Sequence, residues 1–543
     1  MTSTTWSGTE RVLLHGGTIY SPVSPFATAM LVEGDTIAWL GEDSAAAAHR
    51  DSADRVLDLR GALVTPGFVD AHVHTTSTGL VLDGLDLSGT QSLGEALDLL
   101  SLRARALRGG TILGHGWDET RWPEQRPPTR EEIDRASWGS VVYLSRIDVH
   151  SAAVSSALIA AVPAVSSMAG YAPHLPLTRA AHHAVREAAL GSLSAGQRRD
   201  AQRRARAEAA RAGIVALHEM AGPSISGVDD LAGLIDLARA EPGALVFGFW
   251  GELAQEGGIE TARAAGAYAV GGDLSIDGAI GSRTALLTQP YADAPDSLGA
   301  QYLSAHDIAE HVVLASDAHY PTAFHCIGDA ACRLAVDGFE EAAERIGVDR
   351  IRQSGHRLEH AELLDDDGIA SMARLGIIAS MQPMFDEAWA ATGGMYEQRL
   401  GADRSASMNR FADVVASGVA LAFGSDSPVT QLGPWAAVRA AMGHSAAAQR
   451  LSARAAFAAH TRGGWRAVGR PDVGVLAPGA PAHYAVWDVD EVVVQAPDVR
   501  LSAWSTDPRS GTPGLPPLLR DHPLPRCVRT VVAGTTVHDE VED

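Results

Sequence analysis

Short apolar runs alternate with longer Ala- and Arg-rich stretches through the middle of the chain, a pattern typical of a parallel α/β architecture. Eight of these runs have the length and composition of buried strands, and in chain order they are FVDAHVH, GIVALHE, ALVFGFW, DLSIDG, TAFHCIGD, HRLEHAE, GIIASMQP and VALAFGSDSP. Eight strand–helix units predict a TIM (β/α)8 barrel over residues 65–472, with an active site at the C-terminal ends of the strands.

The two ends of the chain have a different pattern. Residues 10–64 contain short β-rich runs separated by turns, and the same texture returns in AHYAVWDVDEVVVQ and VRTVVAGTTVHD. We therefore expect residues 1–64 and 473–543 to form one composite β-sandwich domain. An insertion after the first barrel strand, at about residues 76–200, carries HGWDETRWPEQRPP and is expected to cap the barrel mouth.

Composition limits the classes of partner and the cell compartment that we expect for the protein. The 543 residues are 46% hydrophobic and 20% charged, as in an ordinary globular protein. A formal net charge of −23 argues against nucleic acid or an anionic membrane surface as a partner. The three cysteines form no CxxC pair, the N-terminus resembles no secretory signal, and no uncharged run resembles a membrane span. A cytoplasmic protein is therefore expected.

Residue types that bind metals stand at the carboxyl ends of several predicted strands. His72 and His74 share one face of the first strand, because successive side chains of a strand alternate. His325, His360 and Asp426 each end a later strand. A barrel brings these ends to one point, and histidine with carboxylate suits Zn²⁺ or a similar divalent ion. The sequence therefore predicts a metal site.

Hydrolytic chemistry would follow from such an ion. Bound Zn²⁺ lowers the pKa of a water to about 7 and polarises a carbonyl group. Asp426 is the candidate acid/base, which takes a proton from water and passes it to a leaving nitrogen. His360 is either a metal ligand or a group that steadies the oxyanion.

Several segments together resemble the metal-dependent amidohydrolase superfamily, and in chain order they are TPGFVDAHVH, GWDETRWPE, DGAIGSRTALL, FHCIGDAA, HRLEHAE, IASMQP and FGSDSPV. More narrowly, they resemble the amidohydrolase family 3 branch that contains N-substituted formamide deformylase-like enzymes. The likeness spans nearly the whole chain. It implies a TIM barrel with a composite β domain, hydrolysis at a carbonyl or related carbon, and a small-molecule substrate. Barrels of this kind are often dimers, so a homodimer is compatible with the resemblance.

The resemblance also implies a set of site residues, with one departure. The implied metal ligands are His72, His74, His325 and His360, with Asp426 as ligand and acid/base. Many members carry a lysine on the fourth strand whose carbamate bridges two metals. This chain contains no lysine, since all 43 basic residues are arginine, and Asp273 stands where the lysine is expected.

A carbamate bridge is therefore impossible in this chain. Either the site holds one metal, or an ordinary carboxylate bridges two. The candidate bridging carboxylates are Asp273, Asp277 and Glu219. Asp273 and Asp277 share one face of the predicted fourth strand, and Glu219 ends the second. We favour a single metal, most simply Zn²⁺.

Substrate contacts are predicted at three further positions, each with a structural alternative. Arg283, in the loop Gly281-Ser282-Arg283-Thr284, has the charge to pair with a substrate carboxylate, although it could equally be a surface residue. Trp117 of the insertion could line the pocket or anchor a loop. Gln382 ends the seventh strand and could hydrogen-bond substrate.

Strand alternation also predicts residues that point away from the site. Arg357 and Glu359 fall on the face opposite His360, so we expect them to form an outer structural ion pair. His218 falls opposite Glu219 and is expected to be structural.

Three functions are compatible with these residues. The leading hypothesis is a hydrolase of a non-peptide carbon–nitrogen bond in a small amide or an N-acyl or N-formyl amine. A deaminase or cyclic-amidine hydrolase is the alternative on the same scaffold, and a site without a bridging lysine suits it. The third is a non-catalytic binding protein, because fold does not imply function. The presence of all five candidate metal-binding residues argues against this third hypothesis.

Overall fold

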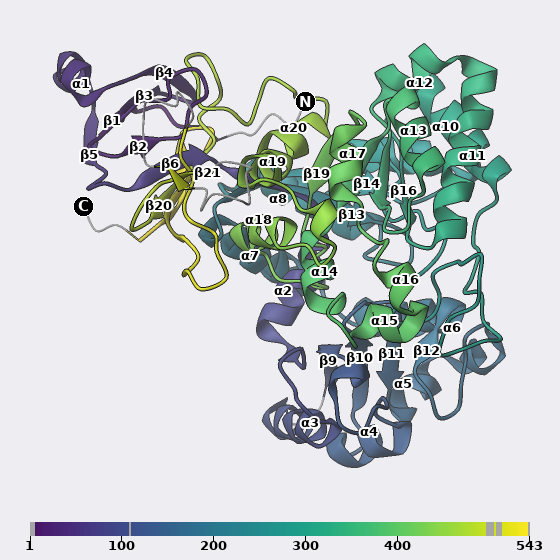
Figure 1. Ribbon diagram of the computed structural model, residues 1–543. Coiled ribbons are helices and arrows are strands. Elements are labelled where there is room, and N and C mark those ends of the chain that lie inside the picture. The colour runs from purple at the N-terminus through teal and green to yellow at the C-terminus, as the bar shows by residue number, and fades with distance from the viewer. Residues whose placement is uncertain (1–5, 108–109, 496–503, 506–512, 541–543) are drawn as a thin grey trace.

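The computed structural model describes residues 6–107, 110–495, 504–505 and 513–540. A central part of strands and helices carries two lobes (Figure 1). One lobe is β-rich and contains strands from both ends of the sequence, and the other is formed by the segment between β7 and β13. Helices and mainly parallel central strands confirm the α/β class.

The central part contains two four-stranded parallel sheets. The first consists of β7 (Phe68–Val73), β13 (Ile214–Ala221), β14 (Leu245–Trp250) and β15 (Ala269–Val270). The second consists of β16 (Ala323–Cys326), β17 (Arg357–His360), β18 (Ile378–Met381) and β19 (Leu421–Phe423). Single parallel bridges join the sheets at both edges, Val73 with Ser427 and Val270 with Thr322. Seven of the eight predicted strand runs overlap seven of these strands.

Helices cover the outer side of the central strands, which explains why the strands are apolar along their whole length. Every residue of β7 and β13 is buried. Four of the covering helices are α10 (Ala305–Asp317), α11 (Asp329–Ile346), α13 (Asp366–Leu375) and α17 (Phe411–Ala416). Their apolar residues share one buried core with the strands, including Val312, Phe339, Met372, Val414, Phe324, Leu358 and Phe423. In the described residues, no helix combines the length and apolarity that crossing a bilayer requires.

The remaining helices of the central part connect or flank these units. They are α8 (Val228–Ala240), α9 (Gly258–Ala265), α12 (Val348–Ser354), α14 (Pro383–Trp389), α15 (Met395–Leu400), α16 (Ala402–Ser405), α18 (Pro434–Met442), α19 (Ala453–Ala458) and α20 (Gly464–Arg466).

The predicted fourth strand was wrong in position. The strand is β15, which lies before DLSIDG rather than within it. Gly271 and Gly272 follow β15 with φ of 134° and 90°, which takes the backbone out of the strand conformation. A Cβ at Gly271 would lie 2.2 Å from the carbonyl oxygen of Ala323, so this close approach requires glycine. Strand alternation therefore does not describe Asp273 and the residues after it.

Strands from both chain ends share one sheet in the β-rich lobe. Its order is β2 (Thr18–Ile19), β6 (Leu63–Pro66), β20 (Tyr484–Asp488), β23 (Arg526–Val532) and β24 (Thr535–Asp539). A second sheet contains β4 (Thr36–Gly41), β3 (Ala29–Glu33), β1 (Arg11–His15) and β5 (Arg55–Asp58), with α1 (Asp43–Arg50) beside it. Apolar side chains of both sheets form one buried cluster, including Leu14, Met30, Val64, Tyr484 and Val531.

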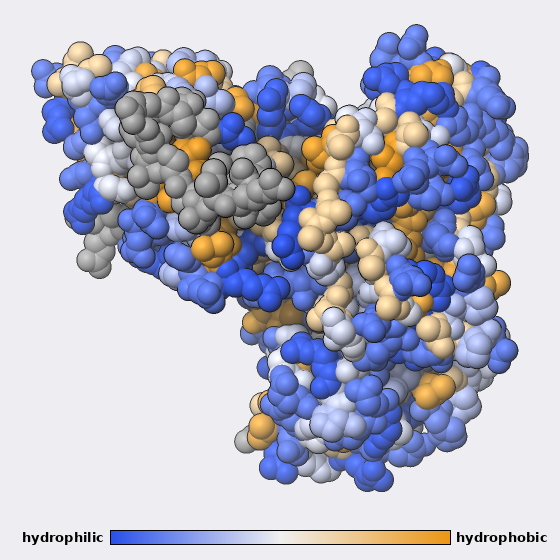
Figure 2. Space-filling model, viewed as in Figure 1, coloured by the Kyte–Doolittle hydropathy of each residue, from blue (hydrophilic) through white to orange (hydrophobic). Residues whose placement is uncertain are grey.

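The insertion lobe has its own sheet, with the order β12 (Leu177–Thr178), β11 (Ser151–Val154), β10 (Val141–Arg146), β9 (Thr111–Trp117) and β8 (Leu85–Asp86). Its helices include α3 (Leu93–Leu107), α4 (Arg130–Ser137), α5 (Ser156–Ala161) and α6 (Arg179–Gly191). The connecting helices α2 (Thr75–Asp83) and α7 (Ala195–Arg211) pack closely, since a Cβ at Gly79 would lie 1.8 Å from the Ala201 carbonyl oxygen. Figure 2 shows that the visible face of this lobe is mostly hydrophilic.

Candidate metal-binding active site

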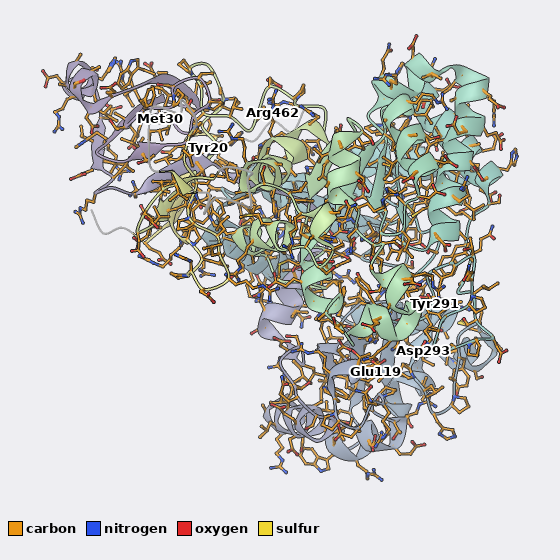
Figure 3. The ribbon with its side chains drawn as sticks, in the orientation of Figure 1. Tyr20, Met30, Glu119, Tyr291, Asp293 and Arg462 are labelled. Carbon is orange, nitrogen blue, oxygen red and sulfur yellow. The ribbon has the colours of Figure 1, made fainter. Side chains whose placement is uncertain are left out.

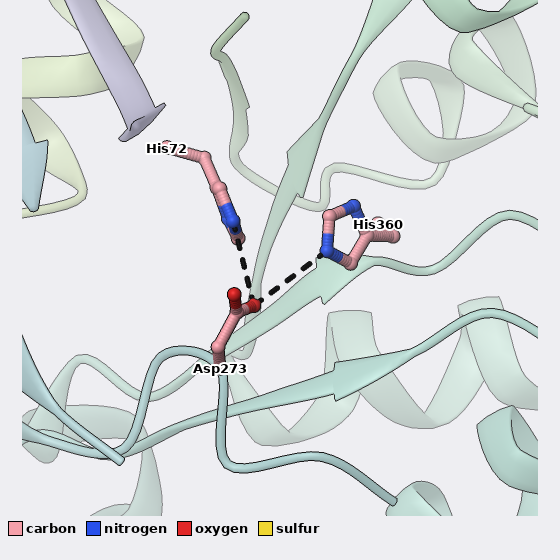
Figure 4. Close-up of side chains that lie close together, drawn as sticks. All are labelled: His72, Asp273 and His360. Atoms are coloured by element: carbon pink, nitrogen blue, oxygen red, sulfur yellow. Dashed lines mark ion pairs between the residues drawn. The ribbon is translucent and has the colours of Figure 1, made fainter. Parts of the chain in front are cut away.

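Six side chains converge at the carboxyl ends of the central strands: His72, His74, Asp273, His325, His360 and Asp426. Asp273 lies in the middle of them. Its Oδ2 is 3.1 Å from Nε2 of His74, and its Oδ1 is 3.4 Å from Nε2 of His72. The same Oδ1 is 3.5 Å from Nδ1 of His325. It is 3.8 Å from Nε2 of His360, and Figure 4 shows Asp273 between His72 and His360.

Asp426 approaches the cluster from the end of β19. Its Oδ1 is 3.2 Å from Nε2 of His74 and 3.5 Å from Nε2 of His72. The backbone around it is tightly packed, because a Cβ at Gly424 would lie 2.5 Å from the backbone nitrogen of His72. This glycine of the FGSD run thus allows β19 to approach β7 closely.

Left-handed backbone conformations set the direction in which two of these side chains point. His360 has φ of 67° and Asp426 has φ of 54°, which are uncommon for residues with a Cβ. At His360 the turn breaks the alternation of β17, so that Glu359 and His360 both contact the cluster.

The predicted outer position of the Arg357–Glu359 pair was therefore wrong. The ion pair exists, with Nε and Oε1 2.8 Å apart, but both side chains are fully buried. Arg357 lies 2.9 Å from Nδ1 of His218, and Glu359 lies 2.9 Å from Nδ1 of His72. Burial opposes ionisation of Glu359, but Arg357 and His72 outweigh it and hold the pKa of Glu359 at about 2. A carboxylate therefore supports His72 from behind.

Each histidine of the cluster is oriented through one ring nitrogen. Nδ1 of His74 donates to the carbonyl oxygen of Met220 at 2.9 Å, and Nδ1 of His360 lies 2.8 Å from Oε1 of Gln382. These contacts leave Nε2 of both rings facing the centre. His325 is turned the other way, because its Nε2 lies 3.3 Å from the Gly278 carbonyl oxygen and its Nδ1 faces Asp273. Metal-ligating histidines are characteristically held in this manner.

The centre of the cluster fits a divalent cation. Nε2 of His72, Oδ1 of Asp273 and Oδ1 of Asp426 are buried and, among the residues that the structure describes, have no hydrogen-bond partner. Burial of such atoms is costly unless a ligand occupies the space between them. Two triads place their ligand atoms within 4.8 Å of one another: His72, Asp273 and His360, and His72, His74 and Asp426. Imidazole with carboxylate is a donor set for zinc and similar ions.

The electrostatics of the cluster also favour a cation. Burial by itself lowers the pKa of His74, but Asp273 and Asp426 outweigh burial and raise this pKa to about 10. The two carboxylates act on the pKa of His72 in the same direction. The cluster therefore attracts positive charge, and a metal ion would displace protons from it.

Asp277 and Glu219 lie beside the cluster with their carboxylates engaged elsewhere. Asp277 accepts hydrogen bonds from the backbone N–H groups of Leu286, Ile327 and Gly328, at 2.8 to 3.0 Å. Oδ1 of Asp277 is 3.9 Å from Nε2 of His325. Glu219 accepts from the backbone N–H of Thr75 at 2.7 Å, at the start of α2. Of the three candidate bridging carboxylates, Asp273 is the one surrounded by histidines.

The structure does not bring the three predicted substrate-binding residues into contact with the cavity beside the cluster. Arg283 makes two hydrogen bonds to Asp293, at 2.7 and 3.1 Å. Trp117 is 1% exposed and donates to the carbonyl oxygen of Leu144. Gln382 supports His360, as described above.

His150 of the insertion reaches the cluster and was missed by the sequence analysis. Its ring centroid lies 5.1 Å from that of His325, and it lines the cavity together with His74 and Asp273. Its backbone N–H donates to Asp148 at 3.3 Å, and Val149 before it has φ of 51°. A lone histidine in an insertion carries no spacing signal, so only the fold could reveal it.

The family of the chain follows from its similarity to known proteins. A model described as "Amidohydrolase family" matches residues 55–538. The chain belongs to the amidohydrolase family. It is 27% identical to the Arabidopsis thaliana protein LONG AFTER FAR-RED 3, over 91% of this chain and 90% of that protein. It is 23% identical to the N-substituted formamide deformylase of Arthrobacter pascens, over 68% of this chain and 72% of that enzyme.

A solved structure agrees with this assignment. An uncharacterized metal-dependent hydrolase from Pyrococcus furiosus is 25% identical and superposes with a TM-score of 0.69, over 88% of this chain and 99% of that one. This amidohydrolase is therefore a metal-dependent hydrolase that acts on carbon–nitrogen bonds.

Proposed function

We propose that this amidohydrolase hydrolyses the carbon–nitrogen bond of a small amide or an N-acyl or N-formyl amine, with one divalent metal, Zn²⁺, in the histidine–aspartate cluster. The observation that carries the proposal is the convergence of six donor side chains. Within the described residues, buried nitrogen and oxygen atoms of three of them have no hydrogen-bond partner. The similarity to a formamide deformylase supports the substrate class.

We also infer that the two central sheets form one closed eight-stranded barrel. Their strands follow one another in chain order, and the parallel bridges Val73–Ser427 and Val270–Thr322 join the two open edges. Closure accounts for the meeting of β7 and β19, and so for the contact of His72 and His74 with Asp426.

In this proposal His72, His74, His325 and His360 hold the metal, with Asp273 or Asp426 completing the set. When bound, the metal supplies a Lewis acid that polarises the carbonyl group and makes water acidic. Asp426 takes a proton from the attacking water and passes it to the leaving nitrogen. Asp426 is 6% exposed, and its Oδ1 has no hydrogen-bond partner in the described residues.

We propose that His150 contacts the substrate rather than the metal. No ring nitrogen of His150 has a hydrogen-bond partner in the described residues, and the side chain lines the cavity beside the cluster. Burial and the neighbouring His325 lower the pKa of His150 well below its usual value, so the ring is a neutral hydrogen-bond donor. It can steady the carbonyl oxygen as negative charge develops there.

A deaminase or cyclic-amidine hydrolase is the second candidate. Asp273 occupies the centre of a site that has no lysine to form a bridging carbamate, and this arrangement suits a mononuclear metal. Release of ammonia, rather than of an amine with a carboxylate or formate, would favour it.

The first test is metal content per chain by plasma mass spectrometry, on protein purified without added metal, followed by turnover of N-formyl and N-acetyl amines. We expect one equivalent and metal-dependent release of amine. Two equivalents would instead support a carboxylate bridge through Asp273. Less than about a tenth of an equivalent, with none regained on reconstitution, would contradict the proposal, because the chemistry requires the ion.

A further inference from the structure

The cavity beside the cluster has walls from both the central part and the insertion. It holds about 120 Å³ and reaches from His74 and Asp273 to helix α6 of the insertion. Most of its lining is apolar, from residues such as Leu85, Leu113 and Ile225. The lining contains one carboxylate, Asp273, and this belongs to the histidine cluster.

Arg186 is the one arginine in that lining, and the only residue of the lining with a permanent positive charge. It lies on the face of α6 that also carries His182 and Leu190, at a spacing of four residues. The hydroxyl of Tyr143 on β10 lies 2.8 Å from Nε2 of His182, which fixes this face against the insertion sheet.

The guanidinium of Arg186 is held in place but not neutralised. Its Nε donates to the carbonyl oxygen of Ser224 at 3.0 Å. In the described parts of the chain, no carboxylate oxygen lies within 4.0 Å of Arg186, and its two terminal amines have no hydrogen-bond partner. By contrast, the buried Arg146 pairs with three carboxylates and the buried Arg399 with two.

The nearby histidines do not compete for an anion. Burial and then Arg186 lower the pKa of His183 to about 4, and the same causes act on His182. Both rings are therefore neutral near pH 7, and the positive charge at this end of the cavity is that of Arg186 alone.

We propose that Arg186 forms a carboxylate-binding subsite, so that substrates carry a carboxylate at the end of an apolar chain, away from the bond that is hydrolysed. The two terminal amino groups of a planar guanidinium can donate two parallel hydrogen bonds to a carboxylate. The apolar walls of the cavity suit an apolar chain between this carboxylate and the bond that is hydrolysed. The inference rests on the proposed function, since it names the substrate class for that site.

The test uses a series of N-formyl ω-amino acids of increasing chain length, each paired with its primary amide. On the metal-loaded enzyme we expect kcat/KM to favour the acid over its amide by roughly 10- to 100-fold at the chain length that spans the cavity, as for a hydrogen bond to a charged group. The Arg186→Met variant should lose this ratio, and Arg186→Lys should restore part of it.

The matched control is Arg199→Met on α7, because Arg199 is exposed and outside the cavity. It should keep the wild-type ratio. An acid-to-amide ratio near one in the wild type at every chain length, or an unchanged ratio in Arg186→Met, would overturn the subsite.

A binding measurement separates this inference from the proposed function. Calorimetry with the methanesulfonamides of the same acids and amides, in which a sulfonyl group replaces the formyl carbonyl, reports the subsite even if no formyl compound is turned over. Tighter binding of the acid that is lost in Arg186→Met would uphold the subsite while the reaction class fails. Equal binding of acid and amide would overturn the subsite.

Discussion

Two buried polar clusters lie where the insertion meets the central part, and they differ in how their charges are satisfied. In the histidine–aspartate cluster, buried atoms of His72, Asp273 and Asp426 have no hydrogen-bond partner within the described residues. In the second cluster, which we call the arginine network, Arg146 and Arg399 are 2% and 4% exposed and every guanidinium nitrogen has an acceptor.

The arginine network joins the insertion to loops of the central part. Glu119 of the insertion accepts from both Arg146 and Arg399, and Asp293 accepts from Arg399 and Arg283. Figure 3 shows Glu119 and Asp293 near each other at this boundary. The loop that contains Gly281 presses on Arg146, since a Cβ there would lie 2.2 Å from Nη1. The GSRT run is thus explained by packing.

This difference separates the cluster to which we assign the chemistry from the cluster that stabilises the fold. A complete set of partners is typical of a cluster that positions parts of the fold, whereas an incomplete set requires a ligand to repay the cost of burial. Substitutions in the two clusters should therefore have different consequences, one for chemistry and one for stability.

The largest effect is expected from removing the proposed acid/base. Asp426→Asn should lower kcat/KM by roughly 10³-fold, since general acid–base catalysis contributes about 10²- to 10⁴-fold. Urea unfolding checks that the variant is folded, because Oδ1 of Asp426 also faces Nε2 of His74 at 3.2 Å. Activity within threefold of the wild type would show that another group transfers the proton.

Breaking the arginine network should mainly affect stability. Arg399→Met removes one partner each from Glu119 and Asp293. Because each carboxylate keeps another arginine, we expect a loss of about 1–3 kcal/mol, as for a buried group that loses a hydrogen-bond partner. Urea unfolding would measure it, with the exposed Arg203→Met as control. Metal content of the folded fraction should remain that of the wild type. Loss of metal with unchanged stability would reverse the assignment of the two clusters.

Substitution of Glu359 should have an intermediate effect, because Glu359 orients His72 without reaching the centre of the cluster. Glu359→Gln should weaken metal affinity by roughly 10- to 100-fold, as for other groups that orient a ligating histidine. Competition with a chelator of known affinity measures this change. The exposed Glu241→Gln is the control. Unchanged affinity would mean that His72 needs no support from Glu359.

The smallest effect concerns pH. Burial lowers the pKa of His356 to about 3 and that of His460 to about 4, so both are neutral in the fold. The unfolded chain binds more protons below pH 6.5, so the stability from these groups is full above pH 6.5 and is lost as pH falls towards 4. His356→Gln should reduce the slope of unfolding free energy against pH by about one proton, or 1.4 kcal/mol per pH unit. A slope unchanged in His356→Gln would contradict the assignment.

Most of the central strands and the metal-binding residue types were predictable from the sequence. Buried parallel strands are apolar along their whole length, and His72, His74, His325, His360 and Asp426 follow such runs directly. The absence of lysine also excluded a carbamate bridge without any structure. These features depend on residue type and local order alone.

Tertiary structure decided what depends on contacts between distant segments. Two glycines shifted the fourth strand away from DLSIDG, and a left-handed conformation at His360 placed Glu359 against His72. His150 and Arg186 have no signal in the sequence, because their neighbours in the cavity come from elements far along the chain. Backbone turns and long-range packing set the direction of a side chain, and local alternation cannot predict either of them.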